Sequence, residues 1–146
     1  MSLIQWLDNG WLRKHVTSKE EIANLMAIVN RDIEDAQVKE ISNDWRFGIA
    51  YNAALKLATI MLYASGYRTE KNLAHYRTIL SLELTIGEHR AADVAYLDAC
   101  RIKRNIVEYD NVGYASSQEA LELLEFAKEL KEEVISILQE KYSHLL

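Results

Sequence analysis

The chain of 146 residues contains no proline. Proline makes up roughly 5% of an average protein. It interrupts helices because it lacks a backbone N–H and its ring clashes with the preceding turn. Only five glycines are present, and apolar residues make up 49% of the chain. This composition predicts long, uninterrupted helices around a buried core.

Length and charge set further bounds. A chain of this size favours a single domain, residues 1–146, and no Pro-, Gly- or Ser-rich linker divides it. The net charge of −5 argues against broad electrostatic binding of nucleic acid but permits a local basic site. The single cysteine, Cys100, favours a reducing compartment. We see no signal peptide and no apolar run of membrane length, so we expect a cytoplasmic location without a membrane.

Local signals place five helices. Ser18 and Ser116 are each followed three residues later by a glutamate, the spacing of a capping box, in which each side chain bonds a backbone N–H of the other residue. Ser42 or Asn43 is the candidate cap of the second helix, and Gly66 is its stop. Residues 1–17 form a candidate N-terminal arm whose tryptophans, Trp6 and Trp11, pack on the bundle or at an interface. The expected helices cover about 19–36, 43–65, 72–84, 88–107 and 117–140.

Short connections between these helices favour antiparallel neighbours, so we expect an all-α, up-and-down antiparallel bundle of four to five helices. A periodicity of 3.6 residues predicts the core face of the fourth helix, with Arg101 and Arg104 lying away from it. The predicted core residues of that helix are Ala92, Ala95, Ala99, Ile102 and Ile106.

A charged and amide-rich segment, Arg101–Asp110, closes the fourth helix. Upstream, Trp45-Arg46 precedes Ile49–Ala54 and then Tyr63-Ala-Ser-Gly66, and His75 follows soon after. In this order and spacing, residues 18–140 resemble the HEPN family of small helical-bundle domains. The resemblance rests on the tyrosine- and alanine-rich second helix ending in glycine, on His75, and on Arg104-Asn105 followed by Tyr109-Asp110.

Many HEPN proteins are ribonucleases whose motif is Arg, a polar residue next to it, and His after a gap of four to six residues. Asn105 matches the polar position after Arg104, but Tyr109 stands where the histidine is expected. Imidazole, with a pKa of about 6.5, can exchange protons near neutrality, whereas tyrosine, at about 10, is a poor base there. The resemblance therefore implies binding without cleavage.

By this resemblance, the site consists of Arg101, Arg104, Asn105, Tyr109 and Asp110 and holds a nucleotide or RNA phosphate. The resemblance also implies a homodimer, and a nucleotidyltransferase partner of the kind found in toxin–antitoxin pairs. We expect no metal and no cofactor. The sequence has no Glu-x-x-His motif, no cysteine pair and no glycine-rich phosphate loop.

Other interpretations stay open. The chain could be an active metal-independent endoribonuclease, with Tyr109, Glu108 or His75 replacing the imidazole; Arg68 and His75 also have the bare motif spacing. It could instead be a structural protein-interaction module, with the basic residues near Arg104 forming a solvated helix end. We expect Cys100 to be a small buried hydrophobic residue. Tyr51 and Tyr63 are expected to pack in the core or at an interface.

Overall fold

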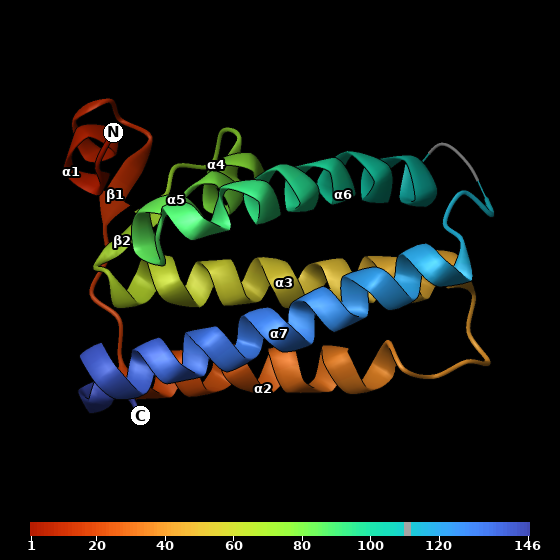
Figure 1. The fold of residues 1–146 in the computed structure, drawn as a ribbon. Coiled ribbons are helices and arrows are strands. Elements are labelled where there is room, and N and C mark those ends of the chain that lie inside the picture. The colour runs from red at the N-terminus through yellow and green to blue at the C-terminus, as the bar shows by residue number, and fades with distance from the viewer. Residues whose placement is uncertain (110–111) are drawn as a thin grey trace.

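The computed structural model describes residues 1–109 and 112–146 and confirms a mostly helical bundle with antiparallel packing. Figure 1 shows the long helices side by side. A small two-stranded sheet, absent from the sequence expectations, joins the N-terminal segment to the bundle. The elements are α1 Leu3–Asp8, β1 Leu12–Lys14, α2 Lys19–Asp35, α3 Asn43–Ala64, β2 Tyr67–Thr69, α4 Ala74–Leu80, α5 Leu82–Thr85, the 3-10 helix η1 Glu88–Arg90, α6 Ala91–Tyr109, α7 Ser117–Lys141 and the 3-10 helix η2 Ser143–Leu145.

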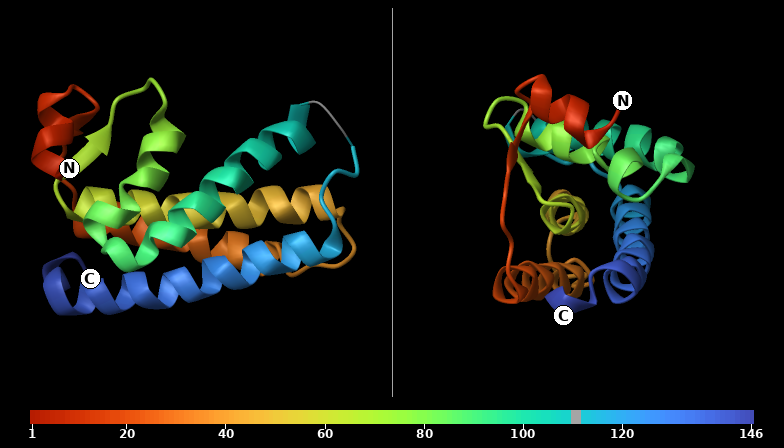
Figure 2. Two further views of the ribbon diagram at one scale, coloured as in Figure 1. Left: turned by 45° about the horizontal axis from the view of Figure 1, so that its top comes forward. Right: turned by 90° about the vertical axis from the view of Figure 1, so that its left-hand side faces the viewer.

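Helix α3 is the centre of the molecule. The end-on view in Figure 2 shows α2 below α3, α7 beside it, and α4, α5 and α6 above it. Its buried residues lie on every side of the helix rather than along one stripe. Four of them are alanines with no exposed surface, which let the neighbouring helices approach closely. These alanines are Ala50, Ala53, Ala54 and Ala58.

The helix starts predicted at three serines are confirmed. The helices expected to begin at about 72 and 88 begin instead as α4 at Ala74 and α6 at Ala91, the latter after η1. The hydroxyl oxygens of Ser18, Ser42 and Ser116 each accept a hydrogen bond from the backbone N–H three residues later. Ser116 and Glu119 form the full reciprocal box. The Glu21 carboxylate does not complete the predicted box at Ser18, because it binds His15 and Thr17 in the N-terminal arm instead.

The segment after Gly66 differs from the expected polar loop. Gly66 ends α3 with a φ of 94°, a left-handed conformation that favours glycine. Residues Tyr67–Thr69 then pair antiparallel with β1. The predicted helix over 72–84 is two helices, α4 and α5, separated at Ser81. The composition, which favours helices, did not predict the turn that leads the chain into β2.

The N-terminal arm packs on the bundle, which decides between the two expectations for its tryptophans. Trp6 is buried with Leu12 and Leu62, and Trp11 packs against the same cluster. The ring centre of His15 lies 4.3 Å from that of Tyr63 near the end of α3. The arm and the β1–β2 sheet are therefore attached to the central helix by side-chain packing.

The predicted core face of α6 is wrong. The face toward the bundle carries Val94, Leu97 and Cys100, and the half-buried Arg101 and Arg104 lie on the same side. The predicted core alanines Ala92, Ala95 and Ala99 are exposed, as is Ile102, while Ile106 is half-buried. Alanine is small enough to suit both environments, so the alternation of alanines did not identify the inner face.

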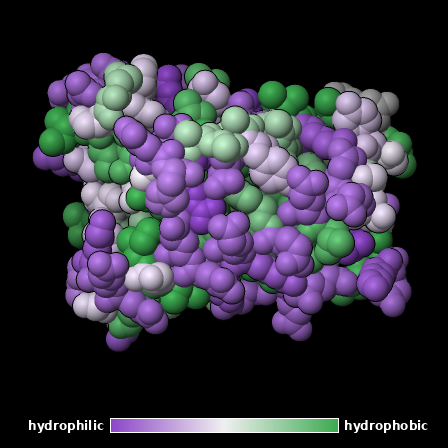
Figure 3. Space-filling view, in the orientation of Figure 1, coloured by the Kyte–Doolittle hydropathy of each residue, from purple (hydrophilic) through white to green (hydrophobic). Residues whose placement is uncertain are grey.

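Helix α3 is also long and apolar enough, by length and composition, to cross a membrane. Of its most apolar window, 67% is buried inside the bundle. Because the core helix of a bundle passes the same test, this property is weak evidence about location. The face of the molecule seen in Figure 3, where α7 lies in front, is mostly hydrophilic.

The central position of α3 predicts a large difference between two leucine truncations. Leu57 on α3 has no exposed surface, so Leu57→Ala should lower the free energy of unfolding by about 2–5 kcal/mol. Leu121 on α7 is 42% exposed, so Leu121→Ala should cost about 0.5 kcal/mol or less. Urea unfolding followed by circular dichroism measures both. Equal losses for the two variants would contradict the central role of α3.

Candidate functional site

Two of the predicted site residues, Arg101 and Arg104, face the interior of the bundle from α6. The guanidinium carbon of Arg104 lies 5.6 Å from the ring centre of Tyr51 on α3. That of Arg101 lies 5.4 Å from the ring centre of Tyr76 on α4. Both distances are within reach of a cation–π interaction. Each arginine therefore lies beside one aromatic ring, Arg104 beside a ring of α3 and Arg101 beside a ring of α4.

Tyr51 is buried, with 1% of its surface exposed, as expected for a core tyrosine. Among the residues that the structure describes, its buried hydroxyl has no hydrogen-bond partner. Burial raises the pKa of Tyr51 to about 12, against the opposing effect of the nearby Arg104 and Arg101 charges. The hydroxyl therefore stays protonated at neutral pH and can act as a hydrogen-bond donor.

His75 joins the same group from the beginning of α4. Its ring centre lies 6.4 Å from that of Tyr51. Partial burial lowers the pKa of His75, and the positive charges of Arg104, Lys56 and Arg101 lower it further. The imidazole therefore favours its neutral form more than a free histidine does.

We call these residues the α3–α4–α6 cluster: Tyr51, Lys56, His75, Tyr76, Arg101 and Arg104. The Asp98 carboxylate accepts a hydrogen bond from Arg101 at 2.8 Å. The positive charges of Arg104, Lys56 and Arg101 all act on the His75 ring. A bound anion near this ring would be attracted by the same three charges. Guanidinium groups and a tyrosine hydroxyl are suitable donors to phosphate oxygens.

The other three predicted site residues are not members of this cluster. Asn105 is exposed on α6, next to Arg104 in sequence but outside the cluster. Tyr109 is the last residue of α6. Asp110 lies outside the described residues, and the structure describes no side chain for either position.

Sequence reasoning missed two members of the cluster, Lys56 and Tyr76, and treated Tyr51 only as a packing residue. The relevant sequence signal was the position of His75 soon after the stop at Gly66. Its nearby arginines are Arg101 and Arg104 of α6, rather than the Arg68 suggested by motif spacing. Only the packing of α4 against α6 brings them together.

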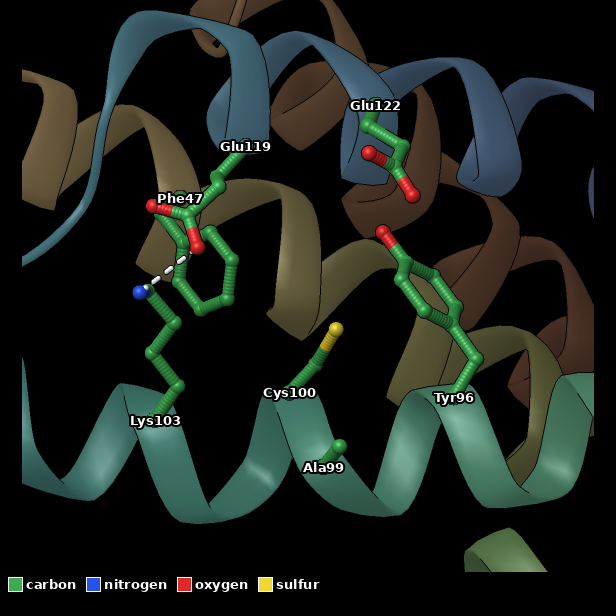
Figure 4. Close-up of a pocket in the computed structure, with 7 residues that line it drawn as sticks. All are labelled: Phe47, Tyr96, Ala99, Cys100, Lys103, Glu119 and Glu122. Atoms are coloured by element: carbon green, nitrogen blue, oxygen red, sulfur yellow. Dashed lines mark ion pairs between the residues drawn. The ribbon is translucent and has the colours of Figure 1, made fainter.

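A separate small cavity of about 180 Å³ lies between α6 and α7. Figure 4 shows Cys100 and Tyr96 reaching into it from α6 and Glu122 from α7. The Lys103 ammonium and the Glu119 carboxylate, 2.7 Å apart, form an ion pair beside it. Burial raises the pKa of the Cys100 thiol to about 11. The thiol thus stays protonated at neutral pH, and the prediction of a small buried hydrophobic residue is confirmed.

Within residues 1–109 and 112–146, no group of three or more His, Cys, Asp or Glu side chains is placed to hold a metal ion. Comparison of the chain with family models, curated proteins and solved structures found no match. The chemistry of the cluster is therefore the basis for any functional proposal.

The cluster predicts the titration of His75. In NMR spectra its pKa should lie below the usual value of about 6.5. Lys56→Gln should raise it, because removing a nearby positive charge makes protonation of the ring easier. Lys39→Gln, which changes an exposed lysine in the loop before α3, should leave it unchanged. A His75 pKa that is the same in the Lys56→Gln protein would show that these charges do not act on the ring.

Proposed function

We propose that the chain is an accessory protein that binds a phosphate group of a nucleotide or an RNA strand at the α3–α4–α6 cluster without cleaving it. The observation that carries this proposal is the placement of two guanidinium groups against aromatic rings of neighbouring helices, Arg104 beside Tyr51 and Arg101 beside Tyr76. The charges of these arginines and of Lys56 also lower the pKa of His75. The chain has a net charge of −5, so this concentration of positive charge is local. The resemblance to HEPN domains supports a nucleotide or RNA as the source of the phosphate.

The geometry suggests a division of roles. The guanidinium groups of Arg101 and Arg104 would donate hydrogen bonds to phosphate oxygens. The Tyr51 hydroxyl would add a neutral donor, since it remains protonated and is buried beside Arg104. The half-buried ring of Tyr76 offers an apolar surface against which a base or sugar can pack.

Substitution of Arg104 tests the proposal. Arg104→Gln should weaken binding of AMP and of a short single-stranded RNA about tenfold or more, because charge-assisted hydrogen bonds to the phosphate are lost. Lys39→Gln should bind like the parent protein. Binding is measured by fluorescence anisotropy or calorimetry, and circular dichroism confirms that each variant is folded. Equal affinity of the Arg104→Gln and parent proteins would rule out this site.

A second candidate function is metal-independent RNA cleavage, favoured by the position of His75. A neutral imidazole beside Arg101 and Arg104 could accept the proton of a ribose 2′-hydroxyl. The freed oxygen would attack the adjacent phosphorus to form a 2′,3′-cyclic phosphate. The 5′-oxygen would leave and take a proton from water.

This candidate predicts cleavage of single-stranded RNA in the presence of a chelator, with loss of cleavage in the His75→Gln protein. Denaturing gels measure the products. RNA that binds but stays intact after long incubation with the parent protein would exclude cleavage and leave the binding role.

We also propose that the chain forms a homodimer through the exposed face of α6. The exposed Ala92, Ala95, Ala99 and Ile102 follow one another at spacings of three and four residues, a pattern that suits close packing of two helices. Ile102 is 51% exposed, which is unusual for isoleucine.

Light scattering after size exclusion tests this interface. Ile102→Glu should convert a dimer to a monomer, because a charge on the shared face would be buried without a partner. Leu121→Glu, on the exposed face of α7, should remain dimeric. A parent protein that is monomeric at every concentration would contradict the proposal.

A further inference from the structure

We infer that the β1–β2 sheet is a second phosphate site, and that the ligand is therefore a single-stranded polynucleotide extending from the α3–α4–α6 cluster to this sheet. This inference rests on the proposed function and specifies its ligand. A mononucleotide would occupy the cluster alone, whereas a strand presents phosphates at both places.

The first evidence is a pair of arginines opposite each other in the β1–β2 sheet. Arg13 of β1 lies directly opposite Arg68 of β2 in the antiparallel register, and both side chains are exposed. Like charges directly opposite each other destabilise a sheet. Glu70 offsets the charge of Arg13 but not that of Arg68. An anion bound at Arg68 would complete the neutralisation of the pair.

The surroundings of the pair add positive charge. A hollow of about 320 Å³ is lined by Arg13, Arg68, Thr69, Glu70 and Lys71. Glu70 forms an ion pair with Arg13. In the part of the chain that the structure describes, no ion pair neutralises Lys14, Arg68 or Lys71. The β1–β2 sheet and the residues that follow it thus carry an excess of positive charge on a protein that is acidic as a whole.

The β1–β2 sheet is held firmly enough to act as a site. On its inner side, Leu12 is buried in the cluster that contains Trp6 and Leu62. The guanidinium carbon of Arg77 on α4 lies 4.8 Å from the ring centre of Trp11, just before β1. These contacts fix the backbone of β1 relative to α3 and α4. Little backbone entropy is then lost when a ligand binds.

The elements that carry the two sites lie on one side of α3. Figures 1 and 2 show the β1–β2 sheet, α4 and α6 in succession along this side. Five residues lie between Thr69 at the end of β2 and His75, so their Cα atoms are at most about 22 Å apart. A strand of several nucleotides covers such a span, and single-strand-binding domains commonly cover about 4–16 nucleotides.

Binding of RNA strands of increasing length tests the inference. We expect affinity for the parent protein to rise between dinucleotides and strands of about eight nucleotides. In the Arg13→Gln/Arg68→Gln protein, the longer strand should bind about tenfold more weakly, and the dependence on log salt should be shallower by about 1.4 for two lost phosphate contacts. Dinucleotide binding should be unchanged. Lys71→Gln, outside the strands, should weaken binding of the longer RNA in the same direction, and Lys39→Gln should have no effect.

The outcomes separate this inference from the proposed function. The second site is refuted, while the cluster remains, if dinucleotides and longer strands bind the parent protein equally well. The same holds if the Arg13→Gln/Arg68→Gln protein folds and binds the longer strand normally. Duplex RNA that binds as tightly as the single strand would refute the single-stranded ligand. If neither length binds the parent protein, both proposals fail.

Discussion

Burial of α3 on all sides is the constraint on which the rest of the structure depends. Its alanines allow α2, α6 and α7 to approach closely, and its larger residues fill the space between them. A helix surrounded in this way is fixed in position, so the polar residues that it carries are fixed as well. Tyr51 is consequently held on the side that faces α4 and α6, where the candidate site forms.

Charge distribution then gives this position a chemical character. The acidic residues of the chain outnumber the basic ones. The charges that act on His75 are nevertheless positive, from Arg104, Lys56 and Arg101. The buried Tyr51 hydroxyl, without a hydrogen-bond partner among the described residues, adds a donor that the packing itself does not use. Buried polar groups are usually satisfied, so an unsatisfied hydroxyl beside a positive cluster is consistent with a site that receives a ligand.

Much of the fold could be predicted from the sequence, because helix ends have local causes. Ser18, Ser42 and Ser116 begin helices through side-chain hydrogen bonds, and Gly66 ends one through its backbone conformation. The inner face of α6 was not predictable, since exposed and buried alanines look alike in a sequence. The candidate site was predictable only in part. Arg101 and Arg104 were identified, but their closeness to His75 and Tyr51 arises from tertiary packing.

Proton uptake on binding tests the central claim most directly, because an anion beside His75 must make the ring easier to protonate. A dinucleotide without terminal phosphates is a suitable ligand, as its diester does not titrate near neutrality. Calorimetry of its binding in buffers of different ionisation enthalpy, at about pH 6.5, measures the protons taken up. The account predicts uptake by the parent protein and none by the His75→Gln protein. Binding without proton uptake between about pH 5.5 and 7.5 would show that the ligand does not lie at the cluster.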